Sequence, residues 1–246
     1  MWCRRFTIGN DWWAGARPYH VNDIGALSPG GDSPDATEIF HEGIRIPGLK
    51  LVERGKLRKD VFETLTHMTR QPGMVGLDLK CEIAANNVAK ARMQDMYDHY
   101  GPELLDAVSS EMIRYSETLL RSRIAQIPDG SWSEQFTIET DQNWRMKLTL
   151  RKEGERLVFD FDGTDRQARQ GINLPYHATF GFCFAALTSS LAYDLPKNHG
   201  VLRALEVVAP EGSLVNVTYP GPVSMSTTSC GFAVAFLANS VLMQML

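Results

Sequence analysis

Cysteine is scarce in this chain of 246 residues, and the pattern of its few cysteines excludes two classes of small protein. The four cysteines lie far apart and form no CxxC motif, which argues against a zinc ribbon and against a dense disulfide framework. The opening MWCRRFTIGNDWW has two arginines but no continuous apolar stretch after them, as a signal peptide would have. These absences predict a cytoplasmic protein with reduced thiols.

The sequence also lacks a strong excess of charge and a phosphate-binding loop. A formal net charge of -4 and a pI near 5.9 give no electrostatic reason to expect nucleic acid or an anionic membrane as a partner. There is no GxxxxGK[ST] motif, and the short SPGG at residues 28–31 cannot cradle the phosphates of a nucleotide. The chain therefore predicts no nucleotide site of its own.

Charged side chains are missing from the end of the sequence. After Glu211 only Cys and Tyr remain as ionisable residue types, and the chain ends in GFAVAFLANSVLMQML. This apolar run is shorter than the ~20 residues that a membrane helix requires, and it contains Asn239, Ser240 and Gln244. We expect a buried helix whose remaining surface needs a continuation of the chain or a partner subunit to cover it.

What the sequence does contain is typical of a globular protein, with 43% hydrophobic and 22% charged residues. Residues 1–50 are rich in turn-forming residues and are predicted to be a loop-rich site segment. Asp60 is predicted to cap a short helix. A helical pair is predicted over 82–126, divided by Gly101 as a helix end and Pro102 in the next first turn. In its second helix, Val108 and Met112 belong to the apolar face.

The period of the pattern changes to two in the second half of the chain, so residues 137–246 are predicted to be a mixed β/α region. Apolar residues alternate with polar ones from Trp144 to Arg151 and again from Leu157 to Asp162, which predicts an antiparallel hairpin. A buried helix and then a strand followed by a proline-rich loop are predicted next. This order of elements predicts a mixed α+β fold.

One short motif within the hairpin suggests a phosphatase. The segment RLVFDFDGTD resembles the signature of haloacid-dehalogenase-like phosphatases, in which Asp160 would attack phosphate and Asp162 would protonate the leaving group. The later pair of acids that would hold magnesium is missing from the sequence, and a glycine after an aspartate explains a turn equally well. We keep this as the weaker interpretation.

A series of longer segments, in a fixed order, resembles the hydantoinase B/5-oxoprolinase family, whose relatives include alpha subunits of acetone and acetophenone carboxylases. The matching segments are HVNDIGALSPGG, ATEIFHEGIRIPGLKL, RQPGMVGLDLKCEIAA, YGPELL, IPDGSW, FDFDGTDRQARQGINLP, NHGVLRALEVVAPEGSLVN and YPGPVSMSTT. Family glycines and prolines are replaced at Ala26 and Gly48, and the opening of the chain does not look like the family's strand. Family members are much longer, so we expect residues 1–246 to be part of such a domain.

The resemblance implies ATP-dependent chemistry at a small-molecule amide or ketone. A cyclic amide would be opened by hydrolysis, or a ketone carboxylated, in a hetero-oligomer with a larger hydantoinase A-type subunit that uses ATP and Mg²⁺. The alternative, from a different class, is a non-catalytic interaction subunit that stabilises this partner.

The resemblance also implies candidate site residues. His20 and Asp23 match the HxxD segment in which the carboxylase relatives hold a divalent metal, here Mn, Zn or Fe, and His41 is the third candidate ligand. The residues alone equally allow Asp23 to cap a turn. Glu42 and Asp78 are the candidate catalytic acids, although Glu42 could instead pair with Arg45.

A further candidate, Arg70, precedes the helical pair. Its guanidinium is suited to hold a phosphate or a carboxylate, although a surface position would explain the residue as well.

Overall fold

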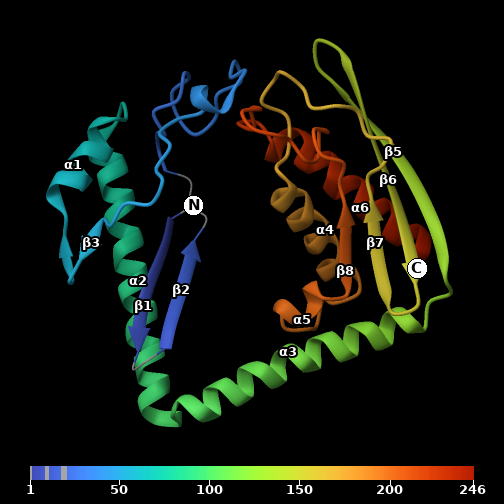
Figure 1. Ribbon diagram of the computed structural model, residues 1–246, viewed down its shortest axis with the longest axis horizontal. Helices are drawn as coiled ribbons and strands as arrows, with labels where there is room; N and C mark the ends of the chain where they lie inside the picture. The colour runs from blue at the N-terminus through green and yellow to red at the C-terminus, as the bar shows by residue number, and fades with distance from the viewer. Residues whose placement is uncertain (1, 9–10, 18–20) are drawn as a thin grey trace. The chain divides into compact units, whose positions relative to one another are not determined.

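The computed structural model describes residues 2–8, 11–17 and 21–246, which divide into two compact units (Figure 1). Unit 1 comprises Met1–Ser33 and Phe40–Ala107, and unit 2 comprises Pro34–Ile39 and Val108–Leu246. The predicted α+β class is confirmed, because both helices and mixed sheets are present.

Unit 1 contains two small antiparallel hairpins and the helices that follow them. The first hairpin pairs β1 (Trp2–Ile8) with β2 (Asp11–Arg17), and the second pairs β3 (Val52–Glu53) with β4 (Lys56–Leu57). The expectation of loop throughout residues 1–50 was therefore wrong for the opening segment. Its strands are rich in aromatic and β-branched residues, and turn-forming Gly9 and Asn10 separate them in the sequence.

The helices of unit 1 begin earlier than the sequence pattern predicts. Helix α1 is Lys59–His67, preceded by the short η1 (Ile39–His41), and α2 is Pro72–Tyr100. Asp60 is not the cap of α1. It lies within the first turn, where its carboxylate accepts hydrogen bonds from the Arg58 guanidinium. Gly101 does end α2, with φ +75°, and α3 (Pro102–Ala125) begins at Pro102 as predicted.

Unit 2 is built on a sheet of four strands in the order β5-β6-β7-β8. Strands β5 (Gly130–Glu139), β6 (Asn143–Glu153) and β7 (Arg156–Asp160) are antiparallel neighbours, which confirms the predicted hairpin and adds β5, which the sequence reading missed. Strand β8 (Leu205–Val208) runs parallel to β7, and α4 (Tyr176–Ser190) and α5 (His199–Leu202) connect the two.

The apolar alternation of β6 and β7 places one face of this sheet in the core. Met146, Leu148 and Leu150 of β6 are fully buried, and Phe159 of β7 joins them. Helix α4 and the C-terminal α6 (Phe232–Met245) contribute side chains to the same core, and the end of α3 adds Ile124. The opposite face carries the polar residues of the alternation.

The C-terminal apolar segment forms the expected helix. A π-helical turn, η2 (Thr227–Gly231), leads directly into α6, which packs against β5 and β6 in Figure 1. The stretch Thr227–Met245 is long and apolar enough to cross a membrane, yet half of it is buried within the protein, as in core helices of globular proteins. Phe232, Phe236 and Met243 remain exposed on its outer side.

Candidate functional site

The segment predicted to carry the site is a loop packed at the start of α2, and Asp23 is its central carboxylate. Asp23 is only 2% exposed. Its Oδ1 accepts the N–H of Gly25 at 2.7 Å and its Oδ2 accepts the N–H of Gly30 at 3.2 Å, so one side chain closes the loop at both ends. Burial alone would raise the pKa of Asp23, but these backbone N–H groups and Arg70 hold it below its usual range.

Arg70 lies just before α2 and binds the same loop. Its Nη1 donates to Asp23 Oδ2 at 3.3 Å, and its Nη2 donates to the Ala26 carbonyl at 2.6 Å. The carbonyls of Leu27 and Ser28 accept two further hydrogen bonds, at 3.1 and 3.4 Å. The suggestion that Arg70 holds a carboxylate is thus met within the protein, with Asp23 as the carboxylate.

Asp78 anchors the beginning of the loop. Its Oδ2 accepts the backbone N–H of Asn22 at 3.1 Å, and the Asn22 amide donates to Gln71 Oε1 at 2.6 Å. Asp78 belongs to the second turn of α2 and Gln71 is the residue before that helix. The sequence reading missed Asn22 and Gln71, since contacts 56 and 49 residues apart leave no local signal.

The segment that carries His41 and Glu42 is joined to the same loop by its backbone. The His41 carbonyl accepts the N–H of Leu27 at 3.0 Å, and the N–H of Ile44 donates to the Ile24 carbonyl at 2.9 Å. The guanidinium of Arg45 lies 4.9 Å from the centre of the Phe40 ring. The structure therefore gathers the segments of Asp23, His41, Glu42 and Asp78 into one region of unit 1.

The described residues do not fit a divalent cation held by Asp23. Both of its oxygens already accept N–H donors, and the positive guanidinium of Arg70 occupies the position beside Oδ2. Within residues 21–246 no three His, Cys, Asp or Glu side chains gather closely enough to hold a metal ion. His20 lies outside the described residues, so metal binding by His20 and His41 stays a prediction.

The DFDGT motif has a structural explanation at the end of β7. Asp160 pairs with Arg151 and accepts the N–H of Asp162 at 2.9 Å. Burial alone would raise the pKa of Asp160, but Arg151 and this N–H hold it below its usual range. The hydroxyl of Thr164 bonds to the backbone of Lys147, which fastens the turn to β6. These contacts favour a strand end over a phosphatase nucleophile.

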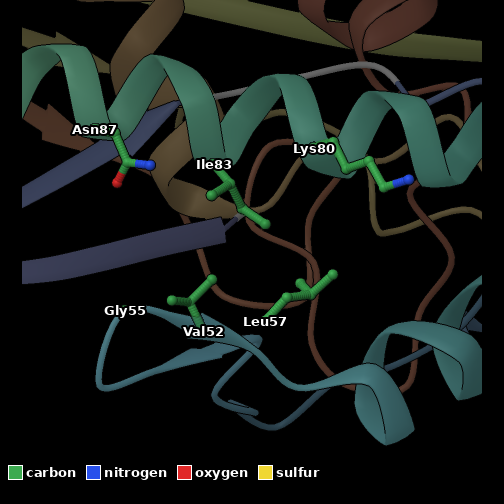
Figure 2. Close-up of a pocket in the computed structure, with 6 residues that line it drawn as sticks. All are labelled: Val52, Gly55, Leu57, Lys80, Ile83 and Asn87. Carbon is green, nitrogen blue, oxygen red and sulfur yellow. The ribbon is translucent and has the colours of Figure 1, made fainter.

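A small pocket of about 220 Å³ lies between the β3–β4 hairpin and α2 (Figure 2). Val52 and Leu57 of the hairpin face Ile83 of α2, and Gly55, Lys80 and Asn87 complete the lining. Lys80 is two positions after Asp78, and two helical positions differ by about 200°. The pocket is therefore on the side of α2 opposite to Asp78 and apart from the predicted site.

Three related proteins are similar to most of this chain. An uncharacterised protein of Methanocaldococcus jannaschii is 32% identical over 85% of this chain and 37% of its own length. A putative D-/L-hydantoinase subunit of a Pseudomonas species is 28% identical over 88% and 39%, and the acetophenone carboxylase delta subunit of Aromatoleum aromaticum 23% over 88% and 32%. The chain thus spans well under half of each of these relatives.

The fold itself is that of a solved enzyme. The ATP-dependent caprolactamase of Pseudomonas jessenii matches 99% of this chain, with a TM-score of 0.88 and 25% sequence identity, over 43% of the caprolactamase chain. The model of the Hydantoinase B/oxoprolinase family matches residues 12–245, nearly the whole sequence. This chain therefore belongs to the hydantoinase B/oxoprolinase family.

Proposed function

We propose that the chain is part of a subunit of an enzyme that uses ATP to open a cyclic amide by hydrolysis. The observation that supports this most is the likeness to the ATP-dependent caprolactamase over 99% of the chain. Another relative is a putative hydantoinase subunit. Hydantoins and caprolactam are both cyclic amides, so the two likenesses point to one type of bond.

The reaction divides between this chain and a larger partner subunit. Water adds to the amide carbon, the C–N bond breaks, and the ring nitrogen takes up a proton. Because the sequence lacks a phosphate loop, we assign ATP and its Mg²⁺ to the partner, of the hydantoinase A type. In this proposal Glu42 acts as the general base toward water. Asp78 is the second carboxylate of the site and holds Asn22 in place.

The test is ATP-dependent turnover by the chain co-expressed with the large subunit encoded beside it. Hydantoin, 5-oxoproline and caprolactam are offered in turn, and ADP release and ring opening are measured. We expect Glu42→Gln to lower kcat by about 10²–10⁴-fold. Glu63→Gln, on exposed α1 of the same unit, is the matched control and should leave kcat unchanged.

Two results would contradict this proposal in different ways. No ATP-dependent opening of any cyclic amide by an assembled complex would reject the reaction. Full activity of Glu42→Gln would reject the role of that residue, and assembly without any effect of Glu42 or Asp78 would favour an interaction subunit.

Carboxylation of a ketone is a second candidate, supported by the similarity to the acetophenone carboxylase delta subunit. It predicts ATP consumption that depends on both a ketone and bicarbonate. The same complex distinguishes the two reactions, since amide hydrolysis requires no bicarbonate.

A further inference from the structure

We propose that Arg70 is a positioning residue that sets the conformation of the loop 22–30. Through that loop it also sets the position of the segment 41–44, which carries His41 and Glu42. Asp23 is then a structural carboxylate of this loop rather than a metal ligand. The link to catalysis rests on the proposed function, whereas the effect on the loop does not.

The first step is the shape of the Arg70 guanidinium. It donates to four acceptors in one short stretch of chain: Asp23 Oδ2 and the carbonyls of Ala26, Leu27 and Ser28. A planar fork with several fixed N–H groups can satisfy such a set, whereas a lysine ammonium is a compact point charge on a flexible stem. Charge alone therefore does not replace Arg70.

The second step leads from the loop to the predicted catalytic segment. Two backbone hydrogen bonds join them, from Leu27 to the His41 carbonyl and from Ile44 to the Ile24 carbonyl. At Gly43 a Cβ atom would stand 2.6 Å from the Ile24 carbonyl oxygen, so the two stretches of chain approach as closely as a glycine permits. A shift of the loop must therefore move His41 and Glu42.

The third step is the small contribution of apolar packing to this loop. Of residues 22–30 only Asp23 and Ala26 are buried, and Leu27 is 56% exposed. The packing of α1 on α2, by contrast, uses Leu65, Val75 and Leu79. Loss of Arg70 should then loosen the loop and leave the helices folded.

Hydrogen exchange tests the positioning role without reference to activity. In the assembled complex, Arg70→Ala should speed exchange of the amides of Gly25, Leu27 and Ile44 by roughly 10- to 100-fold, the factor that corresponds to a hydrogen bond with a charged group. Arg70→Lys should exchange almost as fast as Arg70→Ala. Arg58→Ala removes an exposed arginine of the same unit that pairs with Asp60, and should leave these amides unchanged.

Chemical rescue separates positioning from a general loss of stability. The Arg70 side chain is 42% exposed, so free guanidinium ions at low millimolar concentration can reach the space left by Arg70→Ala. We expect them to restore both slow exchange and kcat in that variant, with no gain in the wild type or in Arg58→Ala. In Asp23→Ala, which lacks the carboxylate partner, guanidinium should restore neither.

The outcomes remain distinguishable from failure of the proposed reaction. Unchanged loop exchange in Arg70→Ala overturns the inference, and so does a fall in thermal midpoint with no change of kcat per folded molecule. If the wild-type complex opens no cyclic amide, the proposed function fails, yet the exchange measurements still decide the role of Arg70.

Discussion

The interiors of the two units of this protein are stabilised by different forces. In unit 2, Met146, Leu148 and Phe159 are fully buried in one apolar core. In unit 1, the loop after residue 21 is held by Asp23 and Arg70 through directional hydrogen bonds. Apolar burial depends mainly on volume, whereas hydrogen bonds depend on donor geometry. The sheet should therefore tolerate changes of shape that preserve volume, and the loop should tolerate almost no change of donor.

This difference suits a division of work between the units. Binding and catalytic residues commonly lie on loops that a rigid framework positions. Here the framework of the site is the start of α2, and polar residues with many partners fix the loop on it. The sheet of unit 2 supplies a large core and places its charged residues in ion pairs, such as Arg151 with Asp160.

The largest expected difference between the units is in cysteine reactivity. Cys81 of α2 is exposed, whereas Cys183 and Cys230 are buried in unit 2, and burial raises the pKa of Cys230 to about 12. Since the thiolate is the reactive form, both buried thiols should react roughly a thousandfold or more slowly than Cys81 near pH 8. Mass spectrometry after timed alkylation of a Cys3→Ser variant measures this ratio.

Comparable rates in native conditions would show that unit 2 opens easily, against a well-packed core. The control is the same protein in concentrated urea, where the rates should converge.

A truncation inside the sheet should have the next largest effect. Phe159 lies at the centre of β7 and is fully buried, so Phe159→Ala should lower the free energy of unfolding by about 3–5 kcal/mol. Phe159→Leu removes less volume and should cost considerably less. Urea titration measures both.

The comparison of the units becomes sharper if loop exchange is measured in the same variants. The amides of Gly25 and Leu27 should keep their wild-type exchange rates in Phe159→Ala under native conditions, because the loop is held by contacts within unit 1. Faster exchange there would show that the polar loop depends on the apolar core.

The sequence predicted the elements whose signals are local. The alternation in β6 and β7 and the glycine and proline between α2 and α3 lie within a few residues, and they were recognised. The burial of α3 was not. Its predicted apolar face includes Val108 and Met112, which are exposed, whereas Ser116, Leu120 and Ile124 are the buried ones. Ser116 is polar, and only tertiary contacts reveal that its hydroxyl donates to the Pro196 carbonyl.

The candidate site shows the same limit. The residues of the loop were recognised from their motifs, but the roles of Asp23 and Arg70 depend on contacts 47 residues apart in the chain. Asp23 was predicted to bind a metal or to cap a turn, and its hydrogen bonds to Gly25 and Gly30 are those of a turn cap. A pattern of residue types can nominate a carboxylate, but it cannot say which donors will reach it.

A smaller effect should separate two glycines of the site region. Gly43 and Gly48 have similar positive φ values, +121° and +111°, which non-glycine residues rarely adopt. Alanine should cost about 1–3 kcal/mol at either position through backbone strain. At Gly43 the new Cβ also meets the Ile24 carbonyl, whereas at Gly48 no atom lies within 4 Å. Gly43→Ala should therefore be the more destabilising in urea titration, and equal effects would contradict the close approach of the loop.

The smallest effect should come from an ion pair that resembles Arg70–Asp23 only on paper. Arg114 and Glu111 pair on the surface of α3, with side chains 68% and 59% exposed. Water solvates both groups when the pair breaks, so Arg114→Ala should leave the urea midpoint unchanged within error. In the loop, Asp23 would keep its buried position and lose a donor. If the two arginine variants changed loop exchange and stability alike, the special role of Arg70 would be lost, since the number of ion pairs rather than the burial of the partner would govern the effect.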